Sequence, residues 1–482
     1  MNLSLRLSLF ACAMAATAAA VSTNSCAASI DKIQTVIVIY GENRSFNNLY
    51  GMFPGADGIG NALRSGAYKQ TDMDGNELAT LPPVWDEETT KIDTTYPPAL
   101  PNMPFRIDAA PINRGLAMKT RDLVHRFYQN QMQINGGKND HFAAISNAGA
   151  LTMGYYDGSS LPMWKLAQQY TLADHFFMGA FGGSFLNHQW LACACTPIYK
   201  DGPDKLRAKL GEQGNLLKKV SSPATINDGS PSFQDAALTP DGYGINTLQP
   251  PYQPSEIAPA GDPALADPEK NPLPPQTQTT IGDTLSEKNI SWKWYSGGWN
   301  RALKDRKQIY GGEVDFQPHH QPFNYFLRFA PGTKDRAEHL KDSTDLLADI
   351  KAGRLPQVSF YKPQGKLNQH PGYADVQSGD GHIAGIIKKL QASPQWKNML
   401  IIVTYDENGG FWDHVAPPKA DRWGPGNRIP AIIVSPYAKR GYVDHTTYDT
   451  TSILKFLTTR FDLKPLPGVR EAVGNLTGAL ID

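Results

Sequence analysis

The chain has few cysteines, no excess charge of either sign and no uninterrupted apolar run long enough to cross a bilayer. Its 46 basic and 46 acidic side chains cancel, so no global field attracts nucleic acid or an anionic membrane. We therefore expect no nucleic-acid partner and no stable insertion into a membrane. Any phosphate chemistry must be local, and the oligomeric state is left open.

Four cysteines do not make a disulfide scaffold in a chain of 482 residues, whose core is large enough without covalent cross-links. Cys12 and Cys26 lie near the amino terminus, which leaves Cys193 and Cys195 in LACACTP. A bridge across one intervening residue is geometrically awkward. We therefore expect two small buried thiols in a helix.

Residues 1–28 are predicted to be a secretory signal peptide. Arg6 precedes an Ala-rich apolar stretch, and small residues precede a cleavage site near Ala27 or Ala28. The apolar stretch is interrupted and too short to serve as an anchor. The protein is thus expected to be exported, either periplasmic or secreted. Lipid attachment at Cys26 is the alternative.

The remaining residues, 29–482, are predicted to form a single domain. A hydrophobic content of 40% and a charged content of 19% are typical of a globular protein with a sizeable core. Two Pro-rich stretches, near 81–113 and 222–280, show little periodicity. We interpret them as long loop insertions that cover the edge of a sheet.

Apolar runs rich in Val and Ile predict strands that are buried on both faces. Helical patterns lie between and after them, beginning at His382 and at Thr451, and residues 449–451 can cap the second helix. This alternation predicts an α/β fold with a doubly wound, mainly parallel central sheet flanked by helices. The predicted strands are 35–40, 291–295, 357–361, 400–405 and 431–434.

Two of these strands end in acidic and amide residues. TVIVIYGENRSF supplies Glu42 and Asn43, and MLIIVTYDENGGFWDHV supplies Asp406 and Glu407. Ligands of such sheets bind beyond the carboxyl ends of the strands, where these oxygens would suit a divalent cation. Crowded carboxylates would raise one another's pKa values without a cation or a basic partner. Ordinary turn residues are the alternative, and calcium, magnesium, manganese, iron and zinc all remain open.

A serine in a glycine-rich turn is a candidate nucleophile. In MGAFGGSFLNHQW an extended segment passes through Gly182 and Gly183 to Ser184, where helical spacing begins. Backbone N–H groups and the helix dipole stabilise an anion at such a position. This setting suits attack on phosphorus by a hydroxyl whose pKa a metal has lowered. An ordinary N-cap serine is the alternative.

Several of the eleven histidines lie in polar segments. His319 and His320 are adjacent in DFQPHHQPF, His370 lies in LNQHPGYADV, and His125 lies in TRDLVHRFYQ. Neutral imidazoles bind metals, whereas protonated ones bind phosphoryl oxygens and protonate a leaving alkoxide. The sequence does not decide between these roles.

Four motifs, in order, carry a resemblance to a known family. GENRSFNNLYGMFPGADG, HRFYQNQMQINGGKNDHF, GGSFLNHQW and TYDENGGFWDHVAPP resemble the phosphoesterase family that contains bacterial phospholipases C and AcpA-type acid phosphatases. The resemblance runs from Ile33 to Leu457 and implies a fold similar to that of alkaline phosphatase. Phospholipases C of this family generally have a threonine nucleophile, whereas Ser184 resembles the acid phosphatase branch.

The resemblance also implies a site. A divalent metal ion would be bound by Glu42, Asn43, Ser184, Asp406 and Glu407, with Ser184 forming a phosphoserine. The histidines that would line the phosphate pocket and serve in catalysis are His125, His319, His320 and His370.

We therefore expect 29–482 to be a phosphoesterase catalytic domain, specifically a secreted, metal-dependent acid phosphatase that hydrolyses small phosphate monoesters through a phosphoserine intermediate. A phospholipase C-like phosphodiesterase is the alternative. It would need an apolar lip, but the aromatic residues near 292–299 are expected to fill the core instead. A non-catalytic exported protein with a structural metal would need neither the serine turn nor the histidines.

Overall fold

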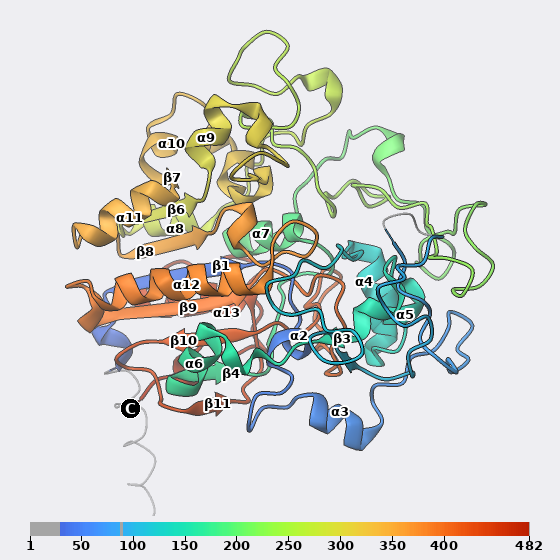
Figure 1. Ribbon diagram of the computed structural model, residues 1–482. Coiled ribbons are helices and arrows are strands. Elements are labelled where there is room, and N and C mark those ends of the chain that lie inside the picture. Colours follow the sequence, from blue (N-terminus) through green and yellow to red (C-terminus); the bar gives the residue numbers. More distant parts are fainter. Residues whose placement is uncertain (1–28, 87–89, 482) are drawn as a thin grey trace, which may run out of the picture.

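The computed structural model describes residues 29–86 and 90–481 (Figure 1). The predicted signal peptide lies outside these residues, so its prediction stays untested. Within the described part of the chain, no helix combines the length and the apolar character that a bilayer crossing requires.

An eight-stranded sheet with the order β11-β4-β10-β9-β1-β8-β6-β7 forms the centre of the molecule (Figure 1). All of its pairings are parallel except the two made by β10. The predicted α/β fold with a mainly parallel sheet is confirmed. The strands are β1 (Thr35–Gly41), β4 (Thr171–Ala173), β6 (Trp292–Ser296), β7 (Leu340–Asp342), β8 (Val358–Lys362), β9 (Met399–Tyr405), β10 (Ala431–Val434) and β11 (Tyr442–Asp444).

The five predicted strands are β1, β6, β8, β9 and β10, each within one residue of the expected bounds. In β1 and β9 every residue is buried, as their unbroken apolar runs indicate. Their register pairs Gly41 with Tyr405, so Glu42 and Asp406 follow at the same level of the sheet edge. Three strands of three residues each, β4, β7 and β11, were not predicted, because such short runs carry no periodicity.

Helices cover both faces of the sheet. Ile39 of β1 pairs with Tyr361 of β8, whose hydroxyl lies 2.7 Å from His382 Nε2 in α12 (Val376–Gln391). The next residue, Tyr40, points to the opposite face, where its hydroxyl donates to the Asn187 carbonyl in α7 (Ser184–Cys193). Helix α12, in front of the strands in Figure 1, packs against α6 (Pro162–Gln169) and α11 (Ser343–Lys351). Helix α7 packs against α8 (Ile281–Glu287) and α13 (Thr450–Phe461).

Both predicted helices are present. Helix α12 begins six residues before His382, because the Asp375 side chain caps it at Val376 by accepting from the Ser378 N–H. Helix α13 is capped by Asp449, which accepts from the Thr451 N–H.

The Pro-rich stretches contain little regular structure. In the described part of 81–113 the only strand is β2 (Phe105–Arg106), which pairs with β3 (Gly154–Tyr155), and 222–280 contains the short 3-10 helix η5 (Pro268–Lys270). Apolar side chains from both stretches, including Ile107 and Phe233, join the main hydrophobic core. The division into a leader and one catalytic domain stays a prediction.

The prediction of two free thiols is wrong, because Cys193 and Cys195 form a disulfide. Helix α7 ends at Cys193, and Ala194 adopts the left-handed conformation with φ 46°. This turn brings the Cα atoms of the two cysteines to 5.1 Å, within the range that disulfides require. The helix end therefore makes the short bridge possible.

The aromatic residues Trp292, Trp294, Tyr295 and Trp299 are core residues, as expected. All four are at most 4% exposed. The first three belong to β6, and Trp299 begins α9 (Trp299–Lys304). They are not available as an apolar lip for lipid.

Candidate active site

The carboxyl ends of β1 and β9 bring the predicted acidic and amide residues together. Glu42, Asn43, Asp406 and Glu407 are completely buried. The Asn43 N–H donates to Asp406 Oδ1 at 3.1 Å. Asn43 has φ 61°, a conformation that asparagine tolerates better than most residues, and this turns the chain directly after Glu42.

Ser184 is the first residue of α7, and its side chain faces this cluster. Its Oγ donates to Asn43 Oδ1 at 3.2 Å and lies 3.5 Å from Glu407 Oε1. The N-cap position belongs to Gly183, so Ser184 does not cap the helix in the ordinary way. Gly182 has φ 88°, and a Cβ there would lie 2.5 Å from the Phe127 nitrogen, so the turn requires glycine.

A buried lysine, Lys362, lies between two of the carboxylates. Its Nζ is 3.4 Å from Glu42 Oε1 and 3.5 Å from Asp406 Oδ2, and it donates to the Gly41 carbonyl at 3.3 Å. The sequence reasoning missed this residue. Lys362 is the last residue of β8, the strand beside β1, so the argument that found Glu42 applies to it as well.

Glu42 is surrounded by donors. His320 Nε2 lies 2.5 Å from Glu42 Oε1, while Tyr373 and Asn368 donate to Oε2. Burial alone would raise the pKa of Glu42, but His320 and Lys362 together hold it well below its usual range. Burial also lowers the pKa of His320 to about 4. The His320 ring and the Lys362 side chain thus both stabilise the ionised form of Glu42.

Asp406 lies beside the same lysine, yet the net pKa shifts of Asp406 and Glu407 are upward rather than downward. Burial raises the pKa of Asp406, and burial together with the Asp406 charge raises the pKa of Glu407 well above its usual value. Asp406 Oδ2 is buried and accepts no hydrogen bond. Lys362 Nζ lies 3.5 Å from this oxygen. The carboxylate, amide and hydroxyl oxygens of this cluster are the kinds of ligand that a divalent cation prefers.

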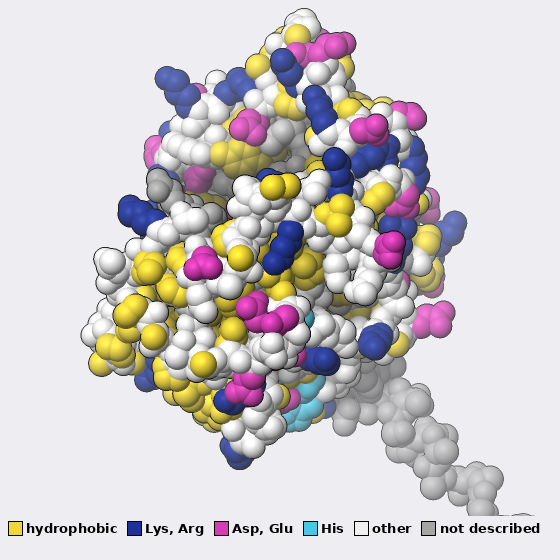
Figure 2. Space-filling view, turned by 90° about the vertical axis from the view of Figure 1, so that its right-hand side faces the viewer, with side chains coloured by type: hydrophobic (Ala, Val, Ile, Leu, Met, Phe, Trp, Pro, Cys, Tyr) yellow, Lys and Arg dark blue, Asp and Glu magenta, His cyan; other side chains and the backbone are white. Residues whose placement is uncertain are grey.

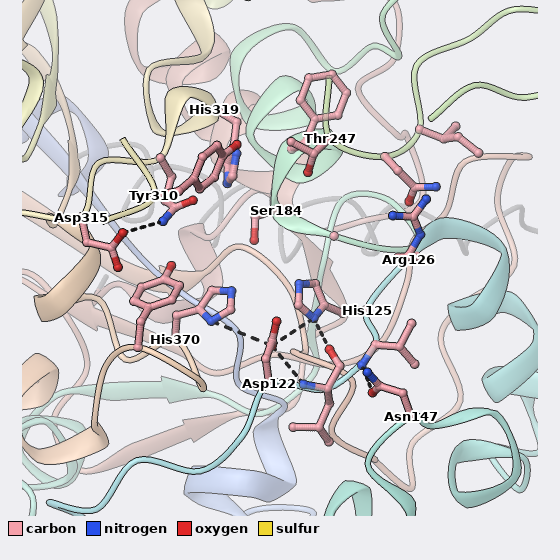
Figure 3. Close-up of a pocket in the computed structure, with 18 residues that line it drawn as sticks. Asp122, His125, Arg126, Asn147, Ser184, Thr247, Tyr310, Asp315, His319 and His370 are labelled. Carbon is pink, nitrogen blue, oxygen red and sulfur yellow. Dashed lines mark hydrogen bonds and ion pairs between the residues drawn. The ribbon is translucent and has the colours of Figure 1, made fainter. Parts of the chain in front are cut away.

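A cavity of about 610 Å³ opens above Ser184. Figure 3 shows the Ser184 side chain pointing into the space between His125, His319 and His370. His125 Nε2 lies 3.3 Å from Asn43 Nδ2, and its Nδ1 is 3.6 Å from Asp122 Oδ1. Asp122 Oδ1 is also 4.0 Å from His370 Nδ1. One carboxylate at the mouth thus faces two of the predicted histidines.

The adjacent residues His319 and His320 occupy different places. His319 lines the cavity, with its Nε2 3.9 Å from Glu42 Oε1. His320 lies behind Glu42 and does not line the cavity. Burial and the neighbouring His320 lower the pKa of His319 well below its usual value. Three of the four predicted histidines therefore face the space above Ser184.

Residues 33–464 match the profile of the Phosphoesterase family. The chain belongs to this family. A relative, "Phospholipase C B" of Mycobacterium tuberculosis, is 25% identical over 492 residues, which cover 94% of this chain and 78% of that protein. "Non-hemolytic phospholipase C" of Burkholderia pseudomallei is 24% identical over 524 residues, covering 96% of this chain and 61% of that protein.

Among solved structures, an alkaline phosphatase superfamily protein of Vibrio parahaemolyticus aligns over 88% of this phosphoesterase and 78% of its own chain, with 11% identity and a TM-score of 0.33. Family membership makes the chain a hydrolase of phosphate ester bonds. The finer choice between monoesters and diesters depends on the site.

The candidate site of this phosphoesterase contains further residues that the sequence reasoning missed. His188 lies one turn after Ser184 in α7, and its Nδ1 is 2.7 Å from the Ser184 carbonyl oxygen. Its ring stacks on that of His320, and its buried Nε2 has no hydrogen-bond partner. The spacing of four residues in SFLNH places both side chains on one helix face and was a usable signal. Loop residues complete the lining without any sequence pattern, among them Asp122, Thr247, Tyr310 and Asp315.

Proposed function

We propose that this phosphoesterase is an exported, metal-dependent acid phosphatase that hydrolyses small phosphate monoesters through a phosphoserine at Ser184. The observation that carries the proposal is the position of Ser184 Oγ. It lies at the start of α7, 3.2 Å from Asn43 Oδ1 and 3.5 Å from Glu407 Oε1, and faces a cavity with histidines on its walls.

The proposed metal ligands are oxygens from two strand ends and the serine turn. When bound, a divalent ion would supply positive charge that lowers the pKa of the Ser184 hydroxyl and offsets charge on the phosphoryl oxygens. Asp406 Oδ2 accepts no hydrogen bond, although Lys362 Nζ lies 3.5 Å away, so this oxygen has a lone pair for a ligand bond. The ligands in this proposal are Glu42, Asn43, Ser184, Asp406 and Glu407.

Ser184 Oγ attacks phosphorus in line with the leaving oxygen, and the bond from phosphorus to that oxygen breaks. The free N–H groups at the start of α7 stabilise the phosphoryl oxygens. His125 and His370 face the same space, and one of them donates a proton to the departing alkoxide. Water then attacks the phosphorus of the phosphoserine and gives a proton to the histidine that had donated one, and the bond from phosphorus to Ser184 Oγ breaks, which releases phosphate. His319 lines the same space, and His320 positions Glu42 from behind.

The charged side chains that line the cavity favour a small charged substrate. Besides the histidines it contains Asp122, Arg126 and Asp315, and the aromatic residues of 292–299 are buried in the core and not in its lining. A phospholipase C-like phosphodiesterase is the second candidate, because the relatives named above are phospholipases C.

The test compares hydrolysis of p-nitrophenyl phosphate, bis-p-nitrophenyl phosphate and phosphatidylcholine across pH, with and without a chelator. We expect preferential cleavage of the monoester, faster in acid because a histidine must be protonated, and lost in the chelator. Preference for either diester would favour the phospholipase alternative. Inactivity on all three after addition of divalent metals would favour a non-catalytic protein.

A further inference from the structure

A second group of metal-ligand side chains lies on the same sheet edge, away from the cavity. Asp174 and His175 directly follow β4, and His445 directly follows β11. These strands are parallel neighbours, with Ala173 opposite Asp444, and the Asp174 N–H donates to the Asp444 carbonyl. The sheet therefore fixes the three side chains beside one another. None of them lines the cavity above Ser184, and β10 separates β4 from β9.

The two histidines converge on one carboxylate. His175 Nδ1 lies 2.9 Å from Asp174 Oδ1, and His445 Nδ1 lies 3.0 Å from the same oxygen and 2.9 Å from Oδ2. One ligand atom from each residue lies within 4.8 Å of the others. Two imidazole nitrogens and a carboxylate oxygen are a ligand set typical of zinc and its neighbours rather than of calcium or magnesium.

Asp57 lies beside this group in the position of a residue that orients a metal ligand. A histidine that binds metal through one nitrogen usually donates its other N–H to a carboxylate. Asp57 Oδ2 lies 3.6 Å from His175 Nε2, and the Asp57 N–H donates to Asp174 Oδ2 at 2.8 Å. His414 and Asn61 hold the other oxygen of Asp57, at 3.0 and 2.6 Å. This outer carboxylate is an observation independent of the three ligands.

The group is open to solvent on one side. Asp174 is completely buried, whereas the His445 side chain is 60% exposed. Figure 2, a view of one face of the molecule, shows histidine side chains at the surface beside acidic side chains. An ion from solution can therefore reach the group without rearrangement of the core.

We propose that Asp174, His175 and His445 bind a divalent transition-metal ion of the zinc class, with an open coordination position toward solvent. Three protein ligands plus one open position is a known arrangement for zinc. The ion would join residues 271 positions apart in the chain at the outer end of the sheet, and would stabilise the folded state because the unfolded chain lacks the site. This proposal does not depend on the function proposed for Ser184.

The test titrates the mature protein with Zn²⁺ by calorimetry and with Co²⁺ by visible absorption, for wild type and His445→Ala. We expect wild type to bind one more equivalent of metal ion than His445→Ala. The variant should also lose one component of the Co²⁺ absorption spectrum. Its phosphoesterase activity should be unchanged. His141→Ala, which removes a histidine outside all the metal-ligand groups among the described residues, should match wild type.

A second variant keeps the three ligands and changes only the outer carboxylate. Asp57→Asn should retain the additional equivalent but bind it about 10- to 100-fold more weakly. Equal stoichiometry for wild type and His445→Ala would overturn the proposal. So would unchanged affinity in both His445→Ala and Asp57→Asn.

Discussion

Lys362 Nζ lies 3.4 Å from Glu42 Oε1, and both side chains are completely buried. The same nitrogen lies 3.5 Å from Asp406 Oδ2. Because β8, β1 and β9 are parallel neighbours, a lysine at the end of one strand meets carboxylates at the ends of the other two. The lysine supplies a fixed charge at an edge where three carboxylates are crowded.

Lys362→Met should destabilise the metal-free protein by roughly 3–5 kcal/mol, because it leaves Glu42 and Asp406 buried without their cation. The measurement is unfolding by denaturant or heat in the presence of a chelator. Lys366→Met changes an exposed lysine four residues later and should alter stability by less than about 0.5 kcal/mol. A similar, small loss in both variants would show that Lys362 does not stabilise the strand ends.

Ser184→Ala should reduce turnover by roughly 10⁴-fold or more, since no other group can form the phosphoserine. Its circular dichroism should match that of wild type. Mass spectrometry after acid quench of wild type should find phosphate on the peptide that contains Ser184. Ser159→Ala, a change at an exposed serine, is the control. Near-normal activity of Ser184→Ala would remove this residue as the nucleophile.

Asp406→Asn should weaken binding of the catalytic metal by orders of magnitude, because it removes the charge of a proposed ligand whose Oδ2 accepts no hydrogen bond. Elemental analysis after dialysis should show the loss, and excess divalent ion should restore part of the activity. Asp462→Asn, at a side chain that is 96% exposed, should keep the wild-type metal content. Unchanged metal content in Asp406→Asn would refute the ligand assignment.

Asp380 should make stability depend on pH. Burial raises its pKa in the folded protein to about 7, against about 3.9 in the unfolded chain. A carboxyl whose pKa is raised by folding favours the folded state at low pH. The contribution of Asp380 to the free energy of unfolding is therefore fully present below about pH 4. It is lost, by about 4 kcal/mol, as the pH rises from about 4 to about 7.

In the wild type, Asp380 Oδ1 accepts a hydrogen bond from the Met163 N–H at 3.0 Å. Asp380→Asn removes the charge but keeps an oxygen that can accept the same hydrogen bond. We expect the variant to be more stable than wild type at pH 8 and similar to it at pH 4, as measured by urea unfolding at both values. Asp204→Asn, at an exposed site, should follow wild type at both. An equal difference at pH 4 and pH 8 would contradict the assignment to Asp380.

Local sequence patterns were sufficient to predict the features that depend on neighbouring residues, such as buried strands and the start of a helix. The apolar runs of β1 and β9 predict strands buried on both faces, and because parallel strands share an edge they also predict that Glu42 lies near Asp406. The glycine-rich turn placed Ser184 at the start of a helix. The same edge rule, applied to β8, would have added Lys362.

The sequence by itself thus determined the fold class, the sheet edge that holds the candidate site and the serine that faces it. Only the tertiary structure decided which of two adjacent histidines reaches the cavity, that Ala194 turns enough for a Cys193–Cys195 bridge, and that Asp174 meets His445. The reason is physical. The burial of a strand or helix follows from the pattern of neighbouring residues. Contacts between side chains hundreds of positions apart depend on strand order and loop packing, which local periodicity does not reveal.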